Sequence, residues 1–342
     1  MKQISIYITE KLKLNKDSKF KYNYHPEDKD ELRSLIEELL EERGKDADLN
    51  DIDVSGITDM SALFSRLINI CNIDISEWDV SNVTNMSYMF EYCKKFSCDL
   101  SDWDVSNVTD MEDMFLKCEN FKSDLSSWDV SNVKNMSMIF KDCINFNSDL
   151  SSWDVSNVTD MQWMFYKCHN FNSDLSKWNV RNVTNMNFAF GECFNFNSDL
   201  SKWNVSKVKD MNNMFVNCRN FNSDLSKWDV SNVKNMNSMF SVCIRFNSDL
   251  SKWDVSNVKN MESMFSSCIN FNSDLSSWNV RNVTTMWGMF YNCTDFKSDL
   301  NKWDISKCKK FDRIFYGCNN FKPEFIKNWD VTPEQYDKFF DK

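Results

Sequence analysis

Apolar and polar residues along this chain follow a pattern that repeats every 25 positions. A tryptophan recurs ten times at this spacing, from Trp78 to Trp303. Self-similarity at a period of roughly 20–50 residues indicates stacked structural units rather than one globular core. The pattern therefore predicts one elongated body, in which each 25-residue coil contacts only its neighbours.

Two shorter periods lie inside each repeat. Trp103 and Val105 alternate with polar residues, which is typical of a short strand with one buried face. Four apolar residues then follow at the spacing of one face of a short helix: Met111, Met114, Phe115 and Cys118. We therefore expect a leucine-rich-repeat-like solenoid whose coils each hold a short parallel β-strand and a short helix. Because helices need more room than strands, the body should curve, with the strands on its concave side.

Segments of different character flank the repeats. Residues 1–50 are predicted to form an N-terminal cap: a hairpin of residues 4–8 and 20–24, then an amphipathic helix over 26–43 that stops at Gly44. The alternative is that this helix binds a partner. Residues 51–331 are predicted to form about eleven repeats. Thr332 followed by Pro333 predicts the start of a C-terminal capping helix over 332–342.

The chain contains thirteen cysteines, ten of which fall in one column of the repeat, from Cys93 to Cys318. Stacked equivalents would lie within disulfide distance, but their Cβ vectors would run parallel rather than towards each other. We therefore interpret them as reduced, buried thiols. A few disulfides or a metal site remain the alternatives, although no Cys/His spacing typical of zinc is present.

Charge and hydropathy limit the partners and the compartment. The formal net charge of −11 argues against a general nucleic-acid binder, which needs an excess of Lys and Arg. No apolar run is long enough for a membrane-spanning helix, and no secretion signal is recognised. We expect a cytoplasmic protein that does not insert into membranes.

The repeated sequence motif, seen for example from Ser101 to Trp128, resembles the BspA-like family of leucine-rich-repeat surface proteins. It is most similar to the 25-residue-repeat branch, first catalogued as a mycoplasma lipoprotein domain of unknown function. The resemblance covers about residues 52–331. It implies a repeat scaffold, often on bacterial surfaces and implicated in attachment to proteins, with no known catalytic residues. By this analogy, a cell or particle surface is the alternative location.

Columns of Asp and Asn are the candidate ligand-binding features. Asp recurs at intervals of 25 from Asp74 to Asp299. We interpret each Asp as an acceptor for backbone N–H groups of its own turn, and the Asn columns as amides that satisfy backbone groups. Calcium bridging is the alternative for the Asp column. Since an active site needs one local set of unlike groups, identical repetition argues against an enzyme. We predict no catalytic residues, metal site or cofactor.

Positions that vary between coils are the candidates for binding. The residue before each Trp changes from acidic at Glu77 to basic at Lys177, and aromatic residues vary on the predicted helical side. The predicted partner-binding residues are Lys177, Asn179, Arg181, Lys202, Asn204, Lys227, Trp163 and Tyr166. A solvated face with cross-strand Lys–Asp pairs is the simpler interpretation. The hypothesis is a non-enzymatic scaffold that binds a protein partner. Self-association as a structural component, or adhesion if the chain is exported, is the alternative.

Overall fold

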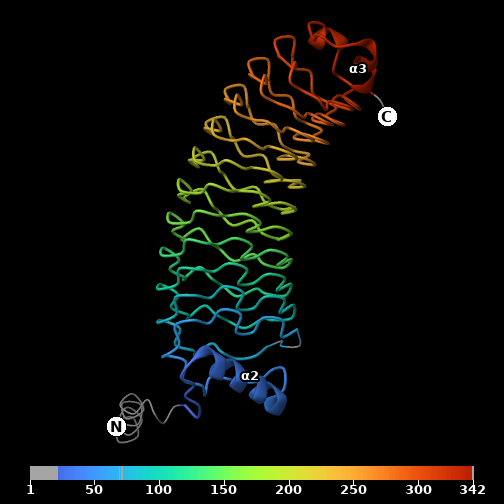
Figure 1. Cartoon of the computed structure of the whole chain (residues 1–342). Helices are drawn as coiled ribbons and strands as arrows, with labels where there is room; N and C mark the ends of the chain where they lie inside the picture. Colours follow the sequence, from blue (N-terminus) through green and yellow to red (C-terminus); the bar gives the residue numbers. More distant parts are fainter. Residues whose placement is uncertain (1–21, 69, 71, 341–342) are drawn as a thin grey trace, which may run out of the picture.

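The computed structural model describes residues 22–68, 70 and 72–340. The chain winds into a bent, elongated stack of coils, with helix α2 (Lys29–Arg43) at one end and helix α3 (Pro333–Lys338) at the other (Figure 1). A short 3₁₀ helix, η2 (Pro323–Ile326), precedes α3. Within the described residues, no helix combines the length and apolar character needed to cross a membrane.

The expectation of a leucine-rich-repeat-like solenoid, with a strand and a helix in every coil, is wrong. The described coils contain only isolated parallel bridges of one residue each, such as Asn185 with Asp210, and no extended strand or helix. Since no strand sheet forms, the predicted concave sheet does not exist either.

The segment expected to be helical forms a ladder of turns instead. In residues 186–193, every second backbone N–H donates to a carbonyl of the next coil, as in Phe188 to Asn212 at 2.9 Å and Phe190 to Met214 at 2.9 Å. The N–H groups between them close turns inside the coil, as in Gly191 to Phe188 at 3.1 Å. A helix would direct all these groups along its own axis and would need ~8–10 Å between neighbouring axes. Because the coils bond directly through their backbones, neighbouring coils lie only about 4.8 Å apart at the bridges. This separation excludes a helix.

Two residues of each turn ladder adopt positive φ, and few of them are glycine. In one coil these are Phe188 (φ 54°) and Glu192 (φ 60°), and in another Ser238 and the β-branched Val242 (φ 63°). Left-handed backbone costs roughly 1–2 kcal/mol at a non-glycine residue. The bonds from each coil to the next hold these residues in place, so the stacked arrangement offsets a strain that an isolated coil would not bear.

The apolar positions of the sequence do form the core. Met111, Met114, Phe115 and Cys118 are fully buried, and Trp103 is 3% exposed. Equivalent aromatic rings stack from coil to coil, for example Phe115 on Phe140 at 5.7 Å and Trp178 on Trp203 at 6.4 Å between ring centroids. The repeat spacing therefore predicted which side chains are buried, although it misled us about the backbone that carries them.

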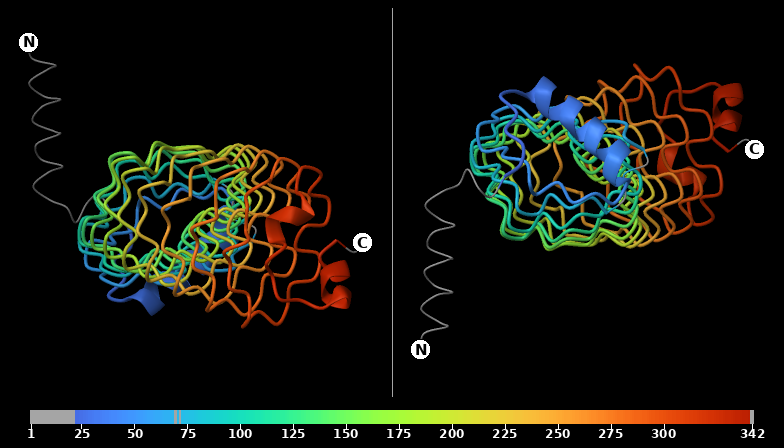
Figure 2. Two further views of the ribbon diagram at one scale, coloured as in Figure 1. Left: turned by 90° about the horizontal axis from the view of Figure 1, so that it is seen from above. Right: turned by 90° about the horizontal axis from the view of Figure 1, so that it is seen from below.

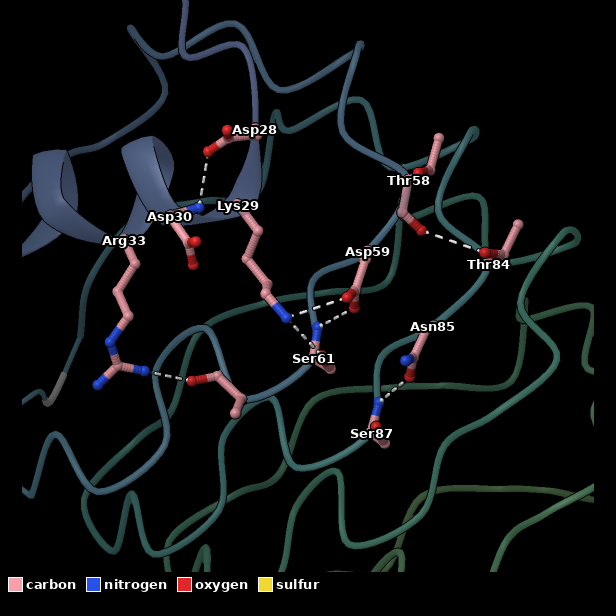
Figure 3. Close-up of polar contacts among 11 residues, drawn as sticks. Asp28, Lys29, Asp30, Arg33, Thr58, Asp59, Ser61, Thr84, Asn85 and Ser87 are labelled. Atoms are coloured by element: carbon pink, nitrogen blue, oxygen red, sulfur yellow. Dashed lines mark hydrogen bonds and ion pairs between the residues drawn. The ribbon is translucent and has the colours of Figure 1, made fainter.

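Helix α2 covers the first coil (Figure 2, right) and begins where Asp28 accepts hydrogen bonds from the N–H groups of Asp30 and Glu31. In the turn ladder each coil donates N–H groups forward, so the carbonyls of the first coil lack donors from a preceding coil. Arg33 of α2 donates to the carbonyl of Ala62, and Lys29 donates to Asp59 at 3.0 Å and to Ser61 at 2.9 Å (Figure 3). Cationic side chains thus donate hydrogen bonds to the acceptors at this end of the stack.

At the opposite end of the stack, the backbone N–H groups of the last coil need hydrogen-bond acceptors. The N–H groups of Arg313 and Phe315 donate to the carbonyls of Lys338 and Phe339, at 2.7 and 3.0 Å. Helix α3 starts as predicted, with Thr332 accepting from the N–H of Gln335 in a capping box. The predicted N-terminal hairpin lies outside the described residues except for 22–24, where Tyr24 forms a parallel bridge with Ile52.

We predict that Arg33→Ala lowers the free energy of unfolding by about 1–2 kcal/mol, because it removes a charged donor from a carbonyl at the end of the stack. Chemical denaturation of the purified chain measures this change. Glu38→Ala, on the exposed side of α2, is the matched control and should have little effect. Equal stability of the Arg33→Ala variant and the parent would contradict the proposed role of α2.

Candidate interaction surface

The Asp column is occupied by structural contacts. Asp174 accepts a hydrogen bond from the N–H of Ser176 at 2.9 Å, as the sequence predicted. Ser173, which directly precedes Asp174, bonds to the neighbouring coil: it accepts from the N–H of Leu150 at 2.8 Å and donates to Asp149 at 3.2 Å. The N–H of Ser151 lowers the pKa of Asp149 most, and the hydrogen bond from Ser173 adds to that effect. The hydrogen bonds of the turn therefore favour the ionised form of Asp149 and hold this carboxylate in place.

The Asn, Trp and Cys columns also bond from coil to coil. The side-chain amide of Asn182 donates to the carbonyl of Ser156 at 2.8 Å, which confirms the interpretation of the Ser-Asn-Val column. The indole Nε1 of Trp178 donates to the carbonyl of Leu150 at 2.9 Å, and Sγ of Cys193 to that of Phe165 at 3.0 Å. The repeated columns thus build the stack, and candidates for binding must lie elsewhere.

The cysteines of the described residues are unpaired thiols. Burial raises the pKa of Cys193 well above its usual value, so the thiol keeps its proton and can donate to the carbonyl of the preceding coil. Within the described residues, no group of three or more His, Cys, Asp or Glu side chains is arranged to hold a metal ion.

The predicted partner-binding residues of the lysine row and its neighbours lie at exposed positions: Lys177, Asn179, Arg181, Lys202, Asn204 and Lys227. The lysines before Trp stand beside the Asp column. The N–H of Ser176 lowers the pKa of Asp174 most, and the charge of Lys177 adds to that effect. The positive charge of this row of lysines therefore partly balances the negative charge of the Asp column.

A second row of lysines was missed by the sequence analysis. Lys209, Lys234 and Lys259 occupy equivalent positions in three successive coils. The same position holds threonine in most other coils, for example Thr184 and Thr284, and an isolated lysine in two more, Lys134 and Lys309. All three are exposed, and each directly precedes a bridge residue, so their Cα atoms lie about 4.8 Å apart. Among the described residues, no ion pair joins any of them to a carboxylate. The change from Thr to Lys in consecutive coils was the available signal.

We define the basic surface as both lysine rows together with the cations between them. Its members are Lys177, Arg181, Lys202, Lys207, Lys209, Lys227, Lys234, Lys252 and Lys259, all exposed. The two rows flank the exposed positions of one segment, which in the first of these coils are 179 and 181 within residues 177–184.

The predicted aromatic residues lie on a different segment of the coil, the turn ladder. Trp163 stacks on Phe188 at 3.9 Å between centroids and meets Tyr166 edge to face at 4.7 Å. Lys141 Nζ lies 4.3 Å from the centre of the Trp163 ring, and the Tyr166 hydroxyl donates to Glu192 at 3.0 Å. Both rings are half-buried. The Trp163 ring and the Tyr166 hydroxyl already make contacts within the stack, so we consider both residues weaker candidates than the basic surface.

The signs of the charges divide the molecule in two. Residues 22–160 contain 30 acidic and 11 basic residues, whereas residues 161–340 contain 18 acidic and 22 basic residues. We call these parts the acidic half and the basic half. The net charges are therefore −19 and +4. The overall net charge of −11 conceals this asymmetry.

These coils match a described repeat family. A family model for "Mycoplasma protein of unknown function, DUF285" matches residues 34–152, 134–247 and 219–329, which together span most of the chain. The chain belongs to this family. Three successive matches agree with the repeat family that the sequence predicted, but the finer assignment of the DUF285 repeats to BspA-like leucine-rich repeats is not confirmed. No curated protein matches the chain.

Asp113 is a buried carboxylate in the acidic half. It is 6% exposed, and its Oδ1 atom has no hydrogen-bond partner within the described residues. Burial, together with the charges of Glu112 and Glu91, raises its pKa to about 6. Asn213 occupies the equivalent position in another coil with the same positive φ, 54° against 53°.

We predict that Asp113→Asn stabilises the protein at about pH 8 by about 1–3 kcal/mol and has little effect at about pH 4. Between these values the folded chain retains a proton on Asp113 that the unfolded chain has lost, so the parent loses stability as pH rises. Denaturant unfolding at the two pH values measures this difference. An equal effect at both pH values would show that the carboxylate charge is not the cause.

We also predict that nearly all thirteen cysteines react in a thiol titration of the denatured, unreduced protein. The parallel stacking of the column is the reason, since equivalent thiols do not point at each other. A count near three would indicate disulfides within the column.

Proposed function

We propose that this DUF285 protein is a non-enzymatic scaffold whose basic surface binds an acidic surface of a protein partner. The row of Lys209, Lys234 and Lys259 carries the proposal, because no carboxylate pairs with it inside the described part of the molecule. The other columns are used for stacking, whereas these side chains make no contact that the coil requires.

Electrostatics supports an acidic partner. Two like charges about 5 Å apart repel by roughly 0.8 kcal/mol in bulk water, and the repulsion grows where solvent is displaced. Three lysines in a row therefore cost stability unless a bound anionic group offsets the repulsion. A rigid row of cations would favour fast association and selectivity for acidic surfaces. The excess of acidic residues elsewhere on the chain disfavours nucleic acid as the partner.

We predict that the protein binds a fluorescently labelled poly-glutamate peptide, used as an acidic probe, and does not bind poly-lysine at the basic surface. Replacing Lys209, Lys234 and Lys259 by Gln should weaken binding by about tenfold and reduce its dependence on salt. Fluorescence anisotropy measures both quantities. The control replaces Lys95, Lys122 and Lys297, which are exposed on other rows, and removes the same charge.

Two further variants separate the candidate positions. Exchange of Lys177, Arg181 and Lys202 for Glu should also weaken binding, because these residues border the same run of exposed positions. The double substitution Trp163→Ala with Tyr166→Ala should leave binding unchanged. If that double variant alone loses binding, the turn ladder is the working surface and the proposal is wrong.

A further inference from the structure

The acidic and basic halves use the same columns of the repeat. The position before Trp holds Glu77 and Asp102 in the acidic half, but Lys177 and Lys202 in the basic half, and all four are exposed. Between them the same column holds Ser127 and Ser152, which are small and neutral. Along one row of the stack the charge therefore runs from negative through neutral to positive.

When a second copy of the chain is turned end for end beside the first, the charges of this row on one copy face opposite charges on the other. Pairing two copies about a two-fold axis between the coils of Ser127 and Ser152 places Lys177 opposite Asp102 of the other copy. The same operation places Lys202 opposite Glu77. Each contact occurs twice, which is the property of a closed, two-fold interface.

We infer that the part of the basic surface that carries Lys177 and Lys202 binds a second copy of this chain, side by side and antiparallel. This inference rests on the proposed function, since it names the partner of the same surface. In the two coils that face these lysines, the interface presents six exposed carboxylates: Asp74, Glu77, Asp79, Asp99, Asp102 and Asp104. The coils beside the axis also carry the exposed residues Asp124, Asp129, Asp149 and Asp154. In the column before Trp, the first lysine along the chain is Lys177.

Stacking end to end fits the structure less well. Helix α2 covers one end, and its exposed residues include Glu37, Glu38 and Glu41 (Figure 1). The other end offers no matching excess of cations, because residues 311–340 contain four basic and five acidic side chains. The backbone groups that another coil would need are also already bonded, as in Arg313 to Lys338. The sides of the stack therefore offer the better complementarity.

Charge exchange between the halves tests the inference. One variant carries Lys177→Glu and Lys202→Glu, and the other carries Glu77→Lys and Asp102→Lys. These positions are exposed, and the Asp residues that cap turns, such as Asp104, are left intact. In the antiparallel pair each variant alone brings like charges together, whereas a mixture of the two restores every opposite pair.

Sedimentation velocity of the full chain at several concentrations gives the readout. We expect a dimer of the parent that dissociates at about 1 M salt, where the Debye length falls to about 3 Å. Each variant alone should be monomeric, and their equimolar mixture should dimerise. The control variant Lys297→Glu with Lys302→Glu lies outside the paired coils, makes the same change in net charge as the variant Lys177→Glu with Lys202→Glu, and should still dimerise.

The outcomes distinguish this inference from the proposed function. The parent could stay monomeric at low salt and still bind poly-glutamate through Lys209, Lys234 and Lys259. This result would support the scaffold function and refute a second copy as the partner. A parent dimer that both variants retain would place the interface elsewhere and also refute the inference. Failure to bind poly-glutamate by a monomeric parent would overturn the proposed function as well.

Discussion

The backbone hydrogen bond from one coil to the next is the constraint on which this fold depends. In the turn ladder it recurs at every second residue, as in Phe190 to Met214 at 2.9 Å. Bonding at this distance fixes the separation of the coils, and that separation excludes a helix from any coil. It also brings each side chain over its equivalent in the next coil, so the aromatic rings stack in columns.

Stacking identical charged side chains brings like charges close together. The columns of the repeat reduce this repulsion in different ways. At the bridge position the chain alternates Asp and Asn over Asp59, Asn85, Asp110, Asn135, Asp160, Asn185, Asp210 and Asn235, so adjacent carboxylates are avoided. The column of Asp74 to Asp299 has no such alternation, but its carboxylates are exposed and bonded to turn N–H groups. Lysines beside them lower the repulsion further. The row of Lys209, Lys234 and Lys259 has neither device, which is why we assign binding to it.

The sequence predicted the core and the ends better than it predicted the backbone. Burial follows side-chain chemistry, so Trp103, Met111 and Phe115 were recognised from spacing alone. The spacing of Met111, Met114, Phe115 and Cys118 suits a helix, yet overlapping turns bury the same residues. Positive φ at Phe188 and Val242 could not be foreseen, since neither residue favours it and the bonds that enforce it come from another coil. At the candidate site, Lys177 was found because it precedes Trp, whereas Lys209 was missed because only stacking reveals its neighbours.

Detection of hydrogen bonds through their scalar couplings tests the central claim most directly. In a long-range HNCO spectrum of the deuterated protein, the account predicts couplings from the amide nitrogens of Phe188 and Phe190 to the carbonyl carbons of Asn212 and Met214, in the next coil. Couplings from these nitrogens to carbonyls four residues earlier in the same coil would indicate helices and contradict the account.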